Sequence, residues 1–114
     1  MPWLKINYDN ALPAFEEVQM PDDDESMAFL DACYSTIECQ SIEVVPTILP
    51  RVLLIIDEEG KLFDGWQKKI NQVATVLYGS SCDCIVSNAI VCVRDGENLV
   101  PMSSADAARL RSFF

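Results

Sequence analysis

The sequence predicts an α+β fold, with one domain over residues 1–114, a mostly antiparallel or mixed sheet of about five to seven strands and about three helices. Short apolar segments joined by hairpin turns dominate the chain, and few segments show helical periodicity. Half of the residues are hydrophobic, so 114 residues can enclose one core without disulfides or metal ions. The helices are expected at roughly 24–36, 66–78 and 103–114.

The first elements are two short strands. Residues 3–8, WLKINY, alternate loosely between apolar and polar side chains and predict a strand. Residues 10–13 form a turn, and residues 14–20 are expected to return as its hairpin partner. The apolar residues of that partner, Phe15 and Val18, are three apart rather than two.

An acidic run, PDDDES at 21–26, precedes the first helix. Asp22 and Glu25 have the spacing of a capping box, and carboxylates favour a helix N-terminus. The run lacks the ligand spacing of a calcium loop, so a helix start explains these acids better than a metal site. The apolar face is expected to contain Met27, Leu30, Cys33 or Tyr34, and Ile37.

The middle of the chain predicts two more strands and a short arm. Residues 39–45 form the first strand. Residues 51–57, RVLLIID, contain five consecutive apolar side chains, which is typical of a central strand covered on both faces. A turn at 58–60 then leads to a hairpin arm at 61–63.

The second helix is expected to begin at Trp66 and to end at Gly79, which suits a left-handed C-terminal residue. Its apolar stripe has helical spacing and contains Trp66, Ile70, Val73, Ala74 and Leu77. A polar flank containing Asn71, Thr75 and Tyr78 lies beside the stripe, facing solvent or a ligand.

The C-terminal part predicts a long strand, an arm and the third helix. Residues 84–93 are apolar except at Ser87 and Asn88, and this break predicts a bulge or a corner. Residues 94–97 form a hairpin turn, and residues 98–101 return from it. Ser103 and Asp106 have the spacing of a second capping box.

Charge and composition exclude several functions. Eighteen acidic and eight basic residues give a formal charge of −10, which disfavours direct binding of nucleic acid. The chain has no histidine, which removes catalytic triads and most zinc hydrolases, and it has no glycine-rich phosphate loop. No apolar run has the length of a membrane span, and no signal peptide is evident. The five cysteines are then expected to be buried or reduced thiols of a cytoplasmic protein.

Binding is the leading functional hypothesis, with Asn71, Thr75, Tyr78 and Asn88 as candidate contacts for a small molecule or a protein and with no cofactor. If Asn71 and Thr75 serve binding, their replacement by alanine should leave the melting temperature nearly unchanged. An acidic decoy that occupies a basic site on a host protein is one alternative.

Another alternative is a metal-dependent enzyme that uses Asp57, Asp64 or Asp83. Cys82 and Cys84 suit either half of a thiolate zinc site or two thiols that point to opposite faces. An exposed Phe113–Phe114 end suits docking on a partner, of which a homodimer is the simplest.

The chain contains several landmarks: Ile42-Glu43-Val44, LLIIDEEGKLFDGW at 53–66, Asn71 with Ala74-Thr75, and Asp83-Cys84-Ile85-Val86 leading into NAIVCV. Together they resemble a family of small proteins of unknown function carried mainly by phages, conjugative elements and Gram-positive gut bacteria. The resemblance implies an α+β domain and a mobile-element setting, without an activity or catalytic residues. The family usually has a glycine where this chain has Ser87, so a positive backbone angle there would be less easily formed.

Overall fold

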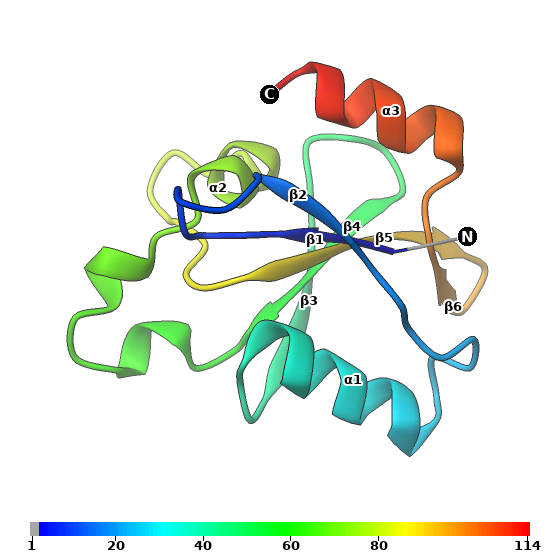
Figure 1. Cartoon of the computed structure of the whole chain (residues 1–114), viewed down its shortest axis with the longest axis horizontal. Helices are drawn as coiled ribbons and strands as arrows, with labels where there is room; N and C mark the ends of the chain where they lie inside the picture. Colours follow the sequence, from blue (N-terminus) through cyan, green and yellow to red (C-terminus); the bar gives the residue numbers. More distant parts are fainter. Residues whose placement is uncertain (1–2) are drawn as a thin grey trace.

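The computed structural model describes residues 3–114 and contains one antiparallel sheet with the strand order β2-β1-β5-β4-β3, to which β6 is added by pairing with β5 (Figure 1). The strands are β1 Trp3–Ile6, β2 Phe15–Val18, β3 Ile42–Pro46, β4 Val52–Asp57, β5 Ala89–Asp95 and β6 Asn98–Val100. The predicted α+β class is confirmed, and every pairing in the sheet is antiparallel. Residues 1 and 2 of the expected domain lie outside the described residues.

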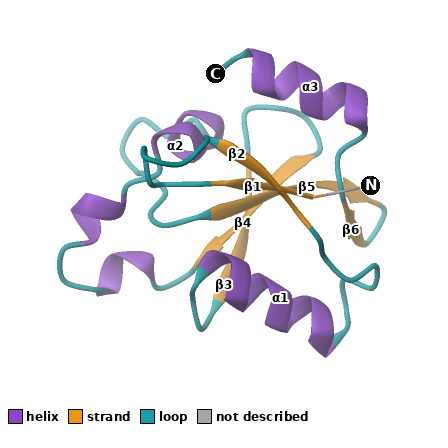
Figure 2. Ribbon diagram, in the orientation of Figure 1, coloured by secondary structure: helices purple, strands orange, loops and turns teal. Residues whose placement is uncertain are grey.

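Helices cover both faces of the sheet. Figure 2 shows α1 (Met27–Ile37) on one side and α2 (Gln72–Tyr78) and α3 (Ser104–Ser112) on the other. The central strand β4 contributes to both cores: Leu53 and Ile55 pack in the α1 layer, and Leu54 packs in the layer of α2 and α3. The expected central strand covered on both faces is therefore confirmed.

The first helix begins later than the capping box predicted. Ser26, rather than Asp22, is the N-cap, and its hydroxyl accepts a hydrogen bond from the backbone N–H of Phe29. Phe29 lies on the buried face with Cys33 and Ile37, and Met27 is exposed. The buried face thus follows positions 29, 33 and 37, which are four residues apart, and the expected Met27 is not part of it.

The segment after β4 is a 3-10 helix, η1 (Gly60–Leu62), and the predicted hairpin arm at 61–63 is wrong. A return arm needs a free strand edge, and β4 already pairs with β3 on one side and with β5 on the other. The turn itself is stabilised by the Asp57 carboxylate, which accepts a hydrogen bond from the Glu59 N–H.

The second helix is shorter than its apolar stripe predicted. Trp66–Lys69 form a separate 3-10 helix, η2, and Ile70 is extended and bridges to Val86. α2 starts only after Asn71, whose side chain accepts a hydrogen bond from the Ala74 N–H as an N-cap. The bridge to Val86 and the cap at Asn71 both interrupt the helix that periodicity predicted.

Ser87 forms the corner that the polar interruption predicted. Its φ angle is 71°, and its N–H donates to the Lys69 carbonyl over 2.7 Å. The chain leaves the bridge at Val86, turns at Ser87 and enters β5 at Ala89 rather than at residue 84. The positive angle that glycine would favour is therefore adopted here by serine, whose hydroxyl donates to the Ile37 carbonyl over 3.3 Å.

Candidate functional site

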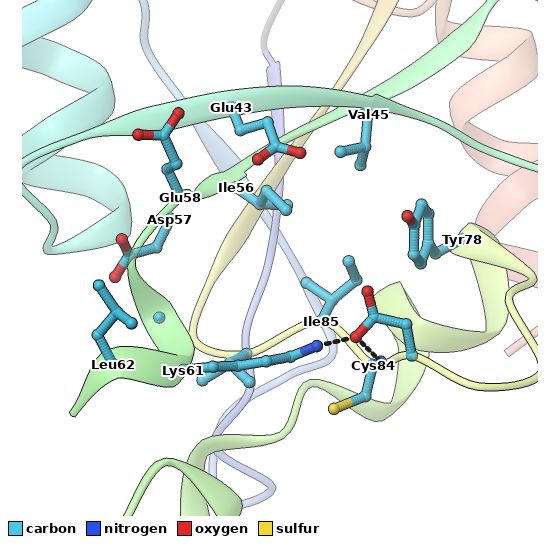
Figure 3. Close-up of a pocket in the computed structure, with 13 residues that line it drawn as sticks. Glu43, Val45, Ile56, Asp57, Glu58, Lys61, Leu62, Tyr78, Cys84 and Ile85 are labelled. Atoms are coloured by element: carbon cyan, nitrogen blue, oxygen red, sulfur yellow. Dashed lines mark hydrogen bonds and ion pairs between the residues drawn. The ribbon is translucent and has the colours of Figure 1, made fainter. Parts of the chain in front are cut away.

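A cleft opens beside β3, between the end of β4 and the loop that precedes β5 (Figure 3). Its free volume is about 150 Å³. The lining comes from five parts of the chain: β3, the end of β4, η1, the end of α2 and residues 83–86. The apolar part of the lining comprises Val45, Ile56, Leu62, Ile85 and Val86.

Carboxylates outnumber cationic groups in this cleft. Glu43, Asp57, Glu58 and Asp83 line it together with a single ammonium group, that of Lys61. Lys61 forms an ion pair with Asp83, which also accepts the Cys84 N–H over 2.9 Å. The charged groups of the lining therefore leave a net excess of three negative charges beside apolar walls, and a cation with an apolar stem would complement both.

Local hydrogen bonds position two of the acids. The Ser41 hydroxyl lies 3.0 Å from a carboxylate oxygen of Glu58, and the Ser41 carbonyl accepts the Glu58 N–H over 3.1 Å. One carboxylate oxygen of Asp57 accepts the hydrogen bond from the Glu59 N–H in the turn after β4. Glu43 projects from β3 and is exposed, so its carboxylate is available to a ligand.

Of the four predicted binding residues, Tyr78 lines the cleft, from the C-terminal end of α2. Figure 3 shows its ring at one end of the cleft, across from Glu43 and Ile85. It is half-buried, and an aromatic ring in this place can contact either the stem or the charge of a bound cation.

Asn71 lies inside the protein instead of facing a ligand. Its side chain is 0% exposed and donates over 3.0 Å to the carbonyls of both Ile6 and Ser87. Its amide oxygen accepts the Ala74 N–H over 3.1 Å. Asn71 thus connects β1, the corner at Ser87 and the start of α2.

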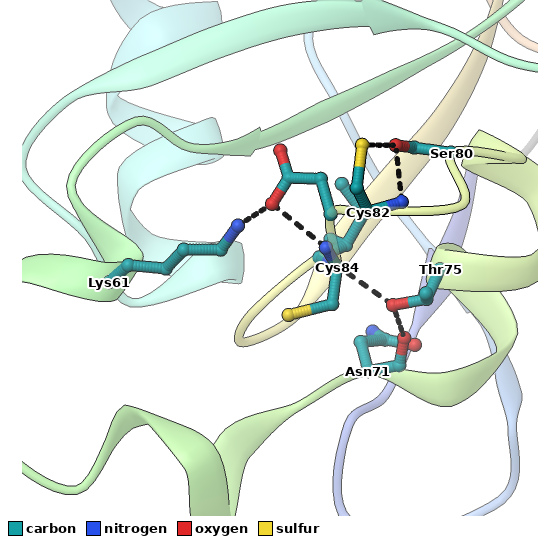
Figure 4. A network of polar contacts seen from close by, with 8 residues as sticks. Lys61, Asn71, Thr75, Ser80, Cys82 and Cys84 are labelled. Atoms are coloured by element: carbon teal, nitrogen blue, oxygen red, sulfur yellow. Dashed lines mark hydrogen bonds and ion pairs between the residues drawn. The ribbon is translucent and has the colours of Figure 1, made fainter.

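Thr75 and Asn88 also use their polar atoms within the chain. The Thr75 hydroxyl donates to the Asn71 carbonyl over 2.7 Å and accepts the Ile85 N–H over 2.9 Å (Figure 4). The buried Asn88 accepts the Tyr8 N–H over 3.2 Å. Thr75 therefore holds the cleft wall at Ile85 in place from behind.

Sequence reasoning missed Glu43 and Lys61 as site residues. Glu43 is a charged residue within an otherwise apolar strand, which was a usable signal. Lys61 gave no comparable signal, because its neighbour Asp83 is 22 positions away and depends on the path of the intervening chain.

The described residues contain no cluster of side chains that could hold a metal ion. Across residues 3–114, no group of three or more Cys, Asp and Glu side chains is placed to share a metal ion. Cys82 is exposed with its sulfur 3.8 Å from the Ser80 hydroxyl, and Cys84 lines the cleft. Figure 4 shows the two sulfur atoms pointing in different directions.

Burial raises the pKa of the Cys33 and Cys92 thiols from 9.0 to about 12. The unfolded chain then loses these protons at lower pH than the folded chain does. The free energy of unfolding should be independent of both thiols below about pH 9 and should fall above it by about 1.4 kcal/mol per pH unit for each thiol, until the folded pKa is reached.

Urea unfolding under reducing conditions, at a series of alkaline pH values, measures this slope. The double variant Cys33→Ala with Cys92→Ala should have a shallower dependence, because it lacks both groups. The variant Cys82→Ala is the matched control, since its thiol is exposed. Equal slopes in all three proteins would contradict the prediction.

The C-terminal aromatic pair is partly solvent-exposed. Phe113 is 70% exposed, and the ring of Phe114 lies 5.9 Å from that of Phe15 between ring centres. Docking of this end on a second copy stays a prediction.

None of the helices in residues 3–114 combines the length and apolar composition needed to span a membrane.

Comparison with known proteins identifies a family but no characterised relative. A family model described as a domain of unknown function (DUF3846) matches residues 6–114. No curated protein and no solved structure matches the chain. The match includes every element around the cleft, from β3 to the loop at residues 83–86.

Proposed function

The chain belongs to this family of unknown function, and from the cleft we propose that it is a non-enzymatic binding domain for a cationic group on an apolar stem. The side chain of lysine or arginine in a partner protein has this chemistry. The observation that carries the proposal is the ratio of four carboxylates to one ammonium group around apolar walls.

The predicted binding residues have two roles in this proposal. Tyr78 contacts the ligand directly, because it lines the cleft. Asn71 and Thr75 shape the site from within, since their hydrogen bonds lead to Ser87 and Ile85. Asn88 accepts a hydrogen bond from the Tyr8 N–H and so holds the start of the turn that follows β1, at the same end of the sheet.

The setting follows from the family resemblance. We infer from it that the protein, like its family, is carried mainly by phages, conjugative elements and Gram-positive gut bacteria and acts in the cytoplasm. A basic side chain of a host protein is then the natural ligand. This origin gives the partner's source, and the cleft gives its chemistry.

Titration by protein NMR tests the proposal with two probes of similar shape. Nα-acetyl-lysine methylamide should shift the amide signals of the residues that line the cleft. Its neutral analogue, Nα-acetyl-norleucine methylamide, should not, because it lacks the ammonium group. Equal shifts from both probes, or none from either, would refute cation binding in the cleft.

A charge-matched pair of variants locates the site. Glu43→Gln should weaken binding of the lysine probe about threefold, as expected for one exposed carboxylate. Glu97→Gln makes the same change of charge in the exposed β5–β6 turn and should leave the affinity unchanged.

The formal charge of −10 favours the acidic decoy as the second candidate function. A decoy acts through its whole surface, so Glu97→Gln would then weaken a basic partner as much as Glu43→Gln does. Binding of the basic partner to a decoy would also be lost at high salt, whereas a ligand whose apolar stem lies in the cleft would retain part of its affinity.

A metal-dependent enzyme using Asp57, Asp64 or Asp83 would instead bind a divalent ion and cleave phosphodiesters or nucleotides.

A further inference from the structure

β3 is an edge strand, and it borders the cleft. It pairs with β4 along one side, and the strand order leaves its other side without a neighbour in the sheet of residues 3–114. Glu43 and Val45 line the cleft, so this face of β3 is part of the proposed site. Val44 lies between them and is 38% exposed.

The register shows which backbone groups face outward. The Ser41 carbonyl accepts the Glu58 N–H over 3.1 Å, which marks residues 41 and 58 as a hydrogen-bonded pair. In an antiparallel ladder such pairs recur at every second residue, so Glu43 and Val45 bond to β4. The backbone groups of Ile42 and Val44 then point to the free edge. Pro46 agrees with this pattern, because it has no N–H to contribute.

We propose that an extended basic segment of a partner protein pairs with the free edge of β3 and inserts a lysine or arginine side chain, placed opposite Glu43, into the cleft. This inference rests on the proposed function and names its partner. The backbone N–H and C=O of Val44 supply hydrogen bonds that any sequence can use, and the cleft selects the basic residue. Residues opposite each other on paired strands project to the same face, so the basic side chain lies on the side of Glu43.

Charge complementarity favours this occupant over a second copy of the chain. β3 itself, IEVVP, contains Glu43 and no basic residue. A second β3 strand at this edge would add a carboxylate to a cleft that already has an excess of three negative charges. A basic segment neutralises the cleft, and β3–β3 pairing does not.

The test uses the full chain and a symmetric peptide, acetyl-Thr-Val-Lys-Val-Thr-amide. When its lysine lies opposite Glu43, the two valines lie opposite Ile42 and Val44, with their N–H groups toward β3. N-methylation of both valines removes these donors, and N-methylation of both threonines removes N–H groups that point away. The two methylated peptides are matched in mass, charge and side chains.

The parent peptide should bind roughly tenfold more tightly than Nα-acetyl-lysine methylamide, as expected for a few additional backbone hydrogen bonds. Methylation of the valines should abolish this gain, and methylation of the threonines should preserve it. Val44→Pro should weaken the parent peptide similarly without weakening the single-residue probe. The peptides alone decide the question if Val44→Pro unfolds the protein.

Three results would overturn the inference. If the methylated peptides bind equally, the edge does not pair, although the cleft still binds cations. If neither the peptides nor the single-residue probe bind, the proposed function fails as well. If the protein is a dimer that Val44→Pro dissociates, a second copy occupies the edge.

Discussion

Replacement of Asn71 by alanine is expected to lower the free energy of unfolding by about 3 kcal/mol, from the loss of buried hydrogen bonds and of a helix cap. The side chain is fully buried and makes three hydrogen bonds, to Ile6, Ser87 and Ala74. Alanine leaves two buried carbonyls with one donor fewer and removes the N-cap of α2. Urea unfolding followed by circular dichroism measures the change.

Two further variants separate these contributions. Gln72→Ala alters the adjacent exposed residue of α2 and should change stability by less than about 0.5 kcal/mol. Asn71→Asp keeps the acceptor for the Ala74 N–H but cannot donate to Ile6 or Ser87, so it should also be strongly destabilised. An unchanged melting temperature for Asn71→Ala, as expected of a ligand contact, would contradict the structural role.

Replacement of Gly79 by alanine is expected to destabilise the protein by about 3 kcal/mol, because two unfavourable effects coincide. Gly79 ends α2 with a φ angle of 77°, which side chains rarely adopt. An added Cβ would also collide with the Ile48 side chain. The Ile48 N–H donates to the Leu77 carbonyl over 2.8 Å, which fixes the Ile48 backbone, so the collision can be relieved only by rotation of the Ile48 side chain.

Gly96 supplies the matched control for backbone strain. Its φ angle is 63°, and an added Cβ would meet no atom within 4 Å, so Gly96→Ala should cost only about 1 kcal/mol. Ile48→Ala in the Gly79→Ala background should recover the part that comes from the collision. Thermal unfolding of these three variants and of the unaltered protein measures both parts, and equal losses for Gly79→Ala and Gly96→Ala would exclude the collision.

The fold class was predictable because its main signals are local. Five consecutive apolar residues within 51–57 identified the central strand, and the turn at 94–97 identified the β5–β6 hairpin. Hydrophobic runs and turn residues operate within a few positions, so the sequence displays them directly. Strand order is not local, and only the structure shows that β1 joins β5.

The second helix illustrates where periodicity misleads. Trp66 and Ile70 fall on the same helical stripe as Leu77, yet Ile70 bridges to Val86 and Asn71 starts a new helix. The sequence pattern predicts that Asn71 faces solvent or a ligand, because an asparagine on a polar flank and a buried cap have the same local pattern. Only the positions of Ile6 and Ser87, both distant in sequence, identify its role.

The cleft was less predictable than the fold. The sequence predicts Asp57 and Asp83 as acids of a metal-dependent enzyme and Tyr78 as a contact of a binding domain, which are separate hypotheses. They share one site because the end of β4, the end of α2 and the loop before β5 converge beside β3. That convergence depends on tertiary structure, so no spacing in the sequence indicated it.

The position of β5 also determines the order in which the fold can assemble. β1–β2 and β3–β4 are local hairpins, and β5 lies between them and pairs with β1 and β4. Leu4 in β1 pairs with Val91 in β5, which lies 87 residues later in the chain, so this second pairing cannot form until β5 is present. Such long-range closure slows folding relative to local pairing. During synthesis the two hairpins therefore remain separate until β5 emerges, and one late strand converts them into a single sheet.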